Sequence, residues 1–238
     1  MTQSFGQELK VRLLRAAEKA AVDQYLRLYS RCFNPDERVS SSIIRRVLKS
    51  SARAVNPVHL FAVYRRREII GGSLTVALPA FQVVFGSYIF VRPSMRGQGF
   101  GATILRETLR QEQRGAGSSF RPWRLYGEVT PASGSAWRRT LARAGFRFFP
   151  TPWPIPSYHE PRKILSARLC YYPLQPHAPE RLSQPAMLAY IYSLFYGPEN
   201  MHRHLLPRLK RFVALDAPGI HHKDTKAQRE KDGQDRQK

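Results

Sequence analysis

Three strand-like runs in direct succession constrain the fold of this chain most. The segment HLFAVYRRREIIGGSLTVALPAFQVVFGSYIFV is rich in β-branched and aromatic residues over roughly 59–64, 69–78 and 82–91. A charged turn and Pro79 separate the runs. Connections this short join antiparallel strands, because a parallel pair needs a crossover of a dozen or more residues. The sequence therefore predicts a unit of antiparallel strands within a larger sheet.

The residues on either side of this unit predict further helices and strands. The predicted elements are a strand over 10–18, helices over 21–33, 40–55, 99–113 and 133–146, and strands over 123–129, 146–149 and 163–172. The proline-dense segment 150–161 lacks too many backbone donors for a central strand and is predicted to be an extended surface loop. This order predicts an α/β or α+β domain with a mixed sheet.

The composition changes beyond this domain. Residues 185–197, PAMLAYIYSLFYG, predict an apolar helix that must be covered by the domain, by a partner or dimer surface, or by a membrane surface. Residues 216–238 are charged and without periodicity, which is typical of disorder. We therefore expect a domain over 1–176, a helical extension over 177–215 and a disordered tail over 216–238.

The 238-residue chain has a formal net charge of +22. This charge favours polyanionic partners, whether nucleic acid, an acidic surface or a phosphate-rich ligand. No window approaches about 18 uninterrupted apolar residues, and no basic segment with a following apolar block opens the chain, so we expect no transmembrane segment and a cytoplasmic location. Cys32 and Cys170 lie in apolar surroundings and predict buried, reduced thiols. The histidines show no metal-ligand spacing.

The glycine cluster RGQGFG, residues 96–101, lies between a predicted strand and a predicted helix. Bare backbone at a helix start lets amide groups approach a bound anion such as phosphate. A Walker A loop is excluded, because no Lys-Ser or Lys-Thr follows the last glycine. Gly97, Gly99 and Ala102 also satisfy the G-x-G-x-x-A fingerprint of dinucleotide sites. The strands before them look antiparallel, however, and no acid lies near Phe120, so the context of that fingerprint is poor.

A third loop pattern agrees with both the motif and the element order. Arg96 to Gly101 match the pattern R/Q-x-x-G-x-G/A, and the order of elements resembles the GNAT superfamily of acetyl-CoA-dependent N-acyltransferases. The segment LYGEVTPASGSAWRRTLARAGF, residues 125–146, resembles the family's later strand and helix, which end in Gly-Phe. The resemblance covers about residues 8–172. It implies a GNAT-like mixed, mostly antiparallel central sheet flanked by helices, with the helical extension following.

The resemblance also implies a binding site for acetyl-CoA as the acyl donor. The pantetheine arm would lie between the strand ending at Val91 and the strand carrying Tyr126 and Glu128. An amide near Phe90 or Val91 would stabilise the developing oxyanion. Arg138, Arg139 and Arg143 are further candidates for phosphate contacts. The pyrophosphate would bind the loop residues Arg96, Gly97, Gln98, Gly99, Phe100, Gly101 and Ala102.

Direct attack by an amine requires a base, and an acid assists the departing thiolate. We predict Glu128 as the base, through a water if necessary, with Glu68 as the second choice. Many family members place a tyrosine that serves as the general acid four residues before the glycine of Gly-Phe, where this chain has Leu141. The tyrosines that remain as candidates, besides thiolate departure without an acid, are Tyr126, Tyr88 and Tyr158.

Two functions follow from these observations. The first is a cytoplasmic N-acyltransferase that moves acetyl from acetyl-CoA to an unidentified primary amine in a ternary complex. The scarcity of carboxylates near the expected cleft argues against polycationic acceptors. The alternative is a GNAT-like protein with little catalysis that binds nucleic acid or a ribosomal surface through its arginines.

Overall fold

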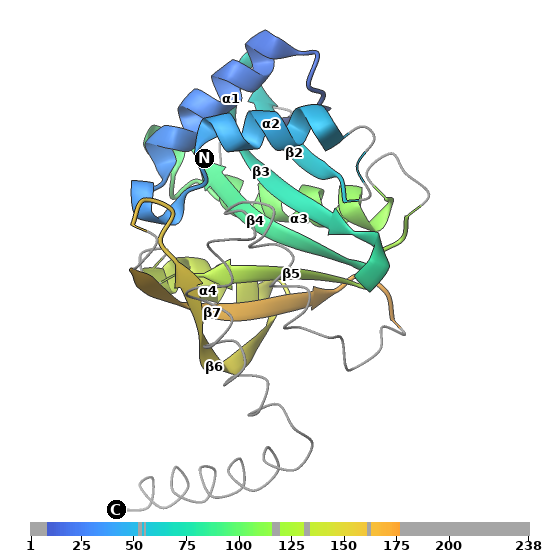
Figure 1. Cartoon of the computed structure of the whole chain (residues 1–238), viewed down its shortest axis with the longest axis vertical. Helices are drawn as coiled ribbons and strands as arrows, with labels where there is room; N and C mark the ends of the chain where they lie inside the picture. Colours follow the sequence, from blue (N-terminus) through green and yellow to red (C-terminus); the bar gives the residue numbers. More distant parts are fainter. Residues whose placement is uncertain are drawn as a thin grey trace, which may run out of the picture.

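A computed structural model describes residues 9–176 of the chain, apart from 52–53, 55, 116–119, 131–133 and 161–162. Its strands form one seven-stranded sheet in the order β1-β2-β3-β4-β5-β7-β6 (Figure 1). All neighbours pair antiparallel except β4 and β5, which pair parallel, so the predicted mixed, mostly antiparallel sheet is confirmed. The strands are β1 (Leu9–Leu14), β2 (Val58–Arg65), β3 (Glu68–Leu78), β4 (Val83–Val91), β5 (Arg124–Val129), β6 (Arg147–Pro156) and β7 (Ile164–Pro173).

Four helices cover the two faces of this sheet: α1 (Lys19–Cys32), α2 (Ser41–Ser51), α3 (Phe100–Gln113) and α4 (Gly134–Arg143). Helices α1 and α2 pack on one face, where their apolar residues join those of β2, β3 and β4 in one core cluster. Helices α3 and α4 pack on the other face, in a second cluster that includes Leu105 and Leu141. The two layers explain why the central strands β2 and β3 are buried almost throughout.

Glycine in β3 lets helix α1 pack directly on the sheet. The buried residues of α1 recur at helical spacing, and Tyr25 among them is fully buried. A Cβ atom on Gly72 would come within 2.5 Å of both a Tyr25 ring carbon and the carbonyl oxygen of Phe61. Only glycine allows this approach, and α1 thereby brings its C-terminal residues, Cys32 and Phe33, to the edge of β4.

The proline-dense segment is the main correction to the sequence prediction. Residues 150–156, predicted to be a surface loop, belong to β6, which pairs with β7 over Pro152↔Arg168, Pro154↔Ser166 and Pro156↔Ile164. Strand β6 is the edge strand, and an edge strand tolerates proline because half of its amides have no partner strand. The exclusion of a central strand was therefore correct, and the prediction of a loop was wrong.

Several other boundaries and predictions can be compared directly. The first strand ends at Leu14, and the residues up to 18, predicted to continue it, form a turn before α1. Both cysteines are free thiols, Cys170 buried and Cys32 half-buried. Within the described ranges, no helix is long and apolar enough to cross a membrane. The predicted helical extension and charged tail, 177–215 and 216–238, lie outside the described residues.

Candidate functional site

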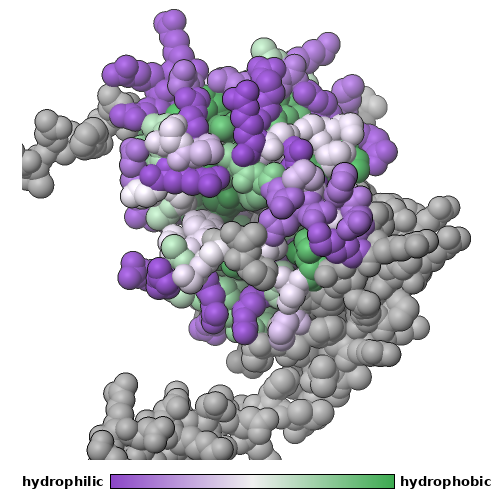
Figure 2. Space-filling view, turned by 90° about the vertical axis from the view of Figure 1, so that its left-hand side faces the viewer, coloured by the Kyte–Doolittle hydropathy of each residue, from purple (hydrophilic) through white to green (hydrophobic). Residues whose placement is uncertain are grey.

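The sheet opens between β4 and β5. These strands pair only over Val83–Gly86 and Arg124–Gly127, so among the described residues the second half of β4 has no neighbouring strand on that side. The opening begins at a bulge, because Thr75 of β3 pairs with Gly86 while Leu74 pairs with Tyr88, which leaves Ser87 unpaired. A cavity of about 630 Å³ occupies the opening and continues to the start of α3. On the side of the molecule that Figure 2 presents, apolar surface shows between hydrophilic side chains.

The hydrogen bonds of β4 determine which backbone groups face the opening. Arg92 N donates to Ile70 O (2.8 Å), which makes this a hydrogen-bonded pair of the antiparallel ladder. Such pairs alternate along the strand, so Phe90 directs its amide and carbonyl to β3, and Val91 and Ile89 direct theirs to the opening. The sequence left Phe90 and Val91 as equal candidates for an amide near the reacting group. The register favours the Val91 amide, because it faces the opening and the Phe90 amide does not.

The glycine loop ends at the N-terminus of α3. Gly97 and Gly99 have φ of 79° and 81°, in the left-handed region that favours glycine. The first hydrogen bond of the helix joins Thr103 N to Gly99 O (3.2 Å), so the amides of Phe100, Gly101 and Ala102 have no partner within α3. A Cβ on Gly97 or Gly99 would meet nothing within 4 Å. The loop therefore presents unpaired amides and open space at the positive end of a helix dipole.

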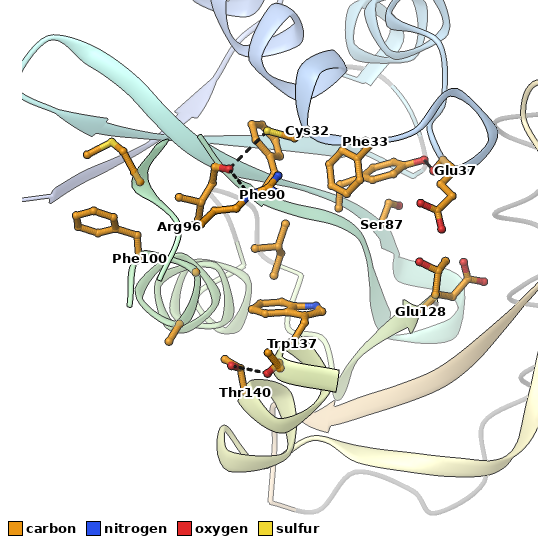
Figure 3. A pocket seen from close by; sticks show the side chains of 18 of the residues that line it. Cys32, Phe33, Glu37, Ser87, Phe90, Arg96, Phe100, Glu128, Trp137 and Thr140 are labelled. Atoms are coloured by element: carbon orange, nitrogen blue, oxygen red, sulfur yellow. Dashed lines mark hydrogen bonds between the residues drawn. The ribbon is translucent and has the colours of Figure 1, made fainter. Parts of the chain in front are cut away.

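Two side chains hold the Val91 carbonyl at the same end of the cavity. Arg96 Nε donates to Val91 O (3.4 Å), and the Cys32 thiol donates to the same oxygen (3.6 Å) (Figure 3). Partial burial raises the pKa of the Cys32 thiol, and the neighbouring Arg96 opposes that rise. Among the described residues that line the cavity, Arg96 is the one lysine or arginine. This end is consequently positive, through the guanidinium and the helix terminus together.

The opposite end of the cavity is lined by carboxylates and aromatic rings. Glu128 at the end of β5 and Glu37 in the segment after α1 both line it, and in Figure 3 the Glu37 carboxylate points toward Glu128. Phe33 lies edge-on to Tyr88, with ring centroids 5.0 Å apart. Burial is the main cause that raises the pKa of Tyr88 to about 12, and the negative charge of Glu128 adds to it. This end is therefore negative and largely apolar.

Glu37 occupies its place because its backbone is fixed on two sides. It ends the short 3-10 helix η1 (Pro35–Glu37), which Asn34 caps by accepting a hydrogen bond from Asp36 N (3.2 Å). Tyr88 donates its hydroxyl hydrogen to Glu37 O (3.1 Å). Asp36 accepts hydrogen bonds from Lys163 and from Ser157 Oγ (2.9 Å), and these bonds hold its pKa below the ordinary value. Segments η1, β4 and the β6–β7 turn are thus joined around the cavity.

The chain is similar to known proteins in structure but not detectably in sequence. No protein-family model and no curated protein sequence matches the chain. A GNAT-family protein of Bacteroides thetaiotaomicron superposes with a TM-score of 0.57 at 14% identity, covering 79% of this chain and 98% of its own. The ribosomal-protein-S18-alanine N-acetyltransferase of Escherichia coli gives 0.54 at 17%, covering 74% and 99%. A Salmonella typhimurium protein solved with its cofactor acetyl-CoA gives 0.51 at 15%, covering 73% and 98%.

The chain has the GNAT fold.

Within this GNAT fold, most of the residues predicted from sequence meet at the cavity. The lining includes Glu128 and, from the predicted donor site, Phe90, Val91, Arg96, Gly97, Gly99, Phe100, Gly101 and Ala102. Gln98 is exposed in the same loop and does not contribute to the lining. Tyr88 and Tyr158 also line the cavity.

Other predicted residues lie away from this cavity. Tyr126 is fully buried, its hydroxyl accepts a hydrogen bond from Arg124 (3.4 Å), and burial raises its pKa. Leu141 is buried in the α3–α4 core cluster and lines a neighbouring cavity of about 50 Å³. Glu68 is an exposed partner of Arg92 (2.9 Å). None of these three residues lines the 630 Å³ cavity.

The arginines predicted as phosphate contacts lie on the exposed side of α4. Arg138, Arg139 and Arg143 are exposed on α4, with Arg138 placed over the ring of Phe148 (5.4 Å). In the described part of the chain, no group of three or more histidine, cysteine, aspartate or glutamate side chains could hold a metal ion.

The structure also reveals lining residues that the sequence did not assign to the site: Cys32, Phe33, Glu37, Ser87 and Trp137. Ser87 Oγ is buried and, among the described residues, has no hydrogen-bond partner. Glu37 belongs to NPDE, which predicts only a break between helices. No local signal marks such residues, because the fold alone brings them beside β4.

Proposed function

We propose that this chain is an N-acyltransferase that transfers acetyl from acetyl-CoA to a primary amine. The observation that carries the proposal is a single cavity with a positive end at the glycine loop and a negative end beside Glu128. An anionic donor and a cationic acceptor would enter such a cavity from opposite ends. The gap between β4 and β5 lies between the two ends, where the reacting groups would meet.

The residues at the positive end fit the pyrophosphate and pantetheine of acetyl-CoA. The unpaired amides of Phe100, Gly101 and Ala102 would bind pyrophosphate oxygens, with Arg96 supplying charge. Gly97 and Gly99 give the loop its conformation, and Gln98 lies between them. The outward amides of Ile89 and Val91 would bind the pantetheine arm in place of a neighbouring strand.

The transfer itself would proceed by direct attack. The amine nitrogen attacks the thioester carbonyl carbon, the carbon–sulfur bond breaks, and an amide and the CoA thiolate form. We assign to Glu128 the proton that the amine loses, passed through a water that Ser87 Oγ helps to hold. The thiolate then takes a proton from solvent, since a thiol pKa of about 8.5 makes it a tolerable leaving group. We assign no step to Tyr126, because its hydroxyl is buried outside the cavity.

Calorimetry with acetyl-CoA tests the donor site. The wild type should bind, and a Gly99→Glu, Gly101→Glu double variant should bind at least about tenfold more weakly. A carboxylate placed about 4 Å from a phosphate charge costs between about 1 and 4 kcal/mol, depending on the local dielectric. Gly134→Glu is the matched control, since Gly134 also has a positive φ (75°) at a helix start with open space around it, but lies outside the cavity lining.

Two results would remove the donor assignment: no binding by the wild type, or equal binding by the wild type and the double variant. Retention on RNA that falls with salt, in a protein that does not bind acetyl-CoA, would instead favour the nucleic-acid-binding alternative. The solved structures that share the fold include proteins named as acetyltransferases, which supports the enzyme over that alternative.

A further inference from the structure

The negative end of the cavity carries a pattern of side chains that bears on the acceptor. Glu37 and Glu128 line it, and no lysine or arginine among the described lining residues lies there, since Arg96 is at the other end. Two carboxylates in a partly enclosed site favour an ammonium group and disfavour an acidic acceptor. The acceptor should therefore enter with a positive charge, lose one proton to become a neutral nucleophile, and lose a second proton when the amide forms.

The carboxylate of Glu37 is available to such a ligand. Among the described residues, its side chain has no hydrogen bond or ion pair, although Asp36 beside it is fully engaged. Its backbone is held, because Glu37 N donates to Asn34 O (3.0 Å) and Glu37 O accepts from Tyr88. A fixed backbone reduces the entropy lost when the side chain binds, so the group is prepared for an external cation.

Apolar walls surround the two carboxylates. The side chains that form them are Phe33, Phe85, Tyr88, Ile155 and Tyr158. Phe85 and Ile155 are nearly completely buried, and the Phe33–Tyr88 pair has its edge-to-face geometry without any ligand. Such walls stabilise a ligand by removing apolar surface from water, and aromatic faces also attract a cation. They offer little to a second or third ammonium, which a polyamine would have to desolvate.

The backbone at this end argues against a peptide acceptor. Asp36 O accepts from Tyr158 N (2.9 Å), and Ser157 N donates to Lys163 O (2.8 Å). Glu37 O and Val39 N are both bonded to the Tyr88 hydroxyl. These groups are therefore already paired within the chain, whereas peptide binding by strand addition relies on open backbone donors and acceptors.

We infer that the acceptor is a small monoamine with an aromatic or similarly flat apolar body, the arylalkylamine class. The Glu37 carboxylate binds its ammonium group, and Phe33 and Tyr88 contact its ring. The ammonium first releases one proton to solvent and becomes the neutral amine, and Glu128 takes the second proton as the nitrogen attacks. This inference rests on the proposed acetyltransferase function and names the acceptor class for the same site.

A panel of amines at one acetyl-CoA concentration tests the inference, with release of the CoA thiol as the readout. The probes are 2-phenylethylamine, spermidine, an alanine-initiated tripeptide and glutamate. We expect kcat/KM for 2-phenylethylamine to exceed that of each other amine at least about tenfold, the discrimination that differences in pocket contacts supply. A preference for the tripeptide, spermidine or glutamate would overturn the inference, as would turnover of none of the four by a protein that binds acetyl-CoA.

A charge-removing variant tests the role of Glu37 directly. In Glu37→Gln, KM for 2-phenylethylamine should rise about tenfold, because an uncharged partner replaces a charge-assisted hydrogen bond. Acetyl-CoA affinity should be unchanged, and kcat should fall less than KM rises. Glu160→Gln, at an exposed glutamate outside the cavity lining, should leave KM as in the wild type.

The two failures can be told apart. Loss of acetyl-CoA binding in the wild type removes the proposed function itself. Unchanged KM in Glu37→Gln, in a protein that still binds acetyl-CoA, removes only the acceptor inference.

Discussion

Replacing Tyr88 by phenylalanine tests which hydrogen bonds stabilise the negative end of the cavity. The Tyr88 hydroxyl accepts a hydrogen bond from Val39 N (3.0 Å) and donates one to Glu37 O (3.1 Å). Val39 is completely buried, so water has no access to its amide once the hydroxyl is gone. Tyr88→Phe keeps the ring and its contact with Phe33, and removes the hydroxyl with these two backbone hydrogen bonds and its contacts to the Tyr29 and Tyr158 hydroxyls.

The loss in stability can be worked from the burial of each group. A buried amide left without an acceptor costs about 1–3 kcal/mol. Glu37 is half-buried, so water can replace the Tyr88 hydroxyl as the partner of its carbonyl oxygen. Loss of this second hydrogen bond therefore adds only about 0.5 kcal/mol. The free energy of unfolding should therefore fall by about 1.5–3.5 kcal/mol, which lowers Tm by about 3–14 °C for a domain of this size.

Urea denaturation is the direct assay, since the midpoint should fall while the slope m stays constant. Tyr64→Phe is the matched control: Tyr64 is half-buried, and no hydrogen bond joins its hydroxyl to the described residues. It should stay within about 0.5 kcal/mol of wild type. If Tyr88→Phe unfolds like that control, the Val39 amide has another partner and the hydroxyl does not hold η1.

Two further predictions concern the core. Gly72→Ala should lower the free energy of unfolding by about 1–3 kcal/mol in urea, because its Cβ would come within 2.5 Å of Phe61 O and of Tyr25, whereas Gly127→Ala, with its nearest atom at 3.5 Å, should cost less. At alkaline pH, burial raises the pKa of the Cys170 thiol from 9.0 to about 12 and that of Tyr88 from 10.0 to about 12. The unfolded chain releases these protons first, so the free energy of unfolding should fall by about 1.4 kcal/mol per pH unit and per group, from pH 9 for Cys170 and from pH 10 for Tyr88. Urea midpoints measured between pH 8 and pH 11 check this, and Cys170→Ala should make the fall between pH 9 and pH 10 shallower, leaving the part that comes from the raised pKa of the Cys32 thiol; a midpoint independent of pH would contradict it.

The central strands and the glycine loop could be predicted because their signals are local. The predicted runs 59–64, 69–78 and 82–91 agree with β2, β3 and β4 to within one residue at each end. Alternation of β-branched residues and strong turn signals determine those limits. The loop before α3 was also identified correctly as a helix start, because arginine, glycine spacing and the following apolar helix occur within a few residues.

At the negative end of the cavity, the sequence identified Glu128, Tyr88 and Tyr158 as candidates but not Glu37, because the residues of this end come from distant parts of the chain. Glu37 follows α1, and its place depends on Tyr88 and on the turn after β6. The same holds for Glu112, which lies inside α3 and is buried against His59 of β2 (2.8 Å). Neither carboxylate has a neighbour in sequence that marks it, since helical periodicity identifies apolar faces and not isolated buried charges.

The gap that makes the site follows from a local irregularity in β4. The bulge at Ser87 lets β4 resume pairing with β3 at Tyr88 while its twist increases, and pairing with β5 ends one residue earlier, at Gly86↔Gly127. Beyond this point β4 makes no ladder hydrogen bonds with β5. Buried backbone groups left without such bonds need other hydrogen-bond partners. Cys32 and Arg96 donate hydrogen bonds to the Val91 carbonyl. They do not bond the outward amides of Ile89 and Val91, which a ligand could therefore bind. The proposed acyl donor would replace the missing strand pairing, so the same bulge that interrupts the sheet leaves backbone amides that a ligand can bind.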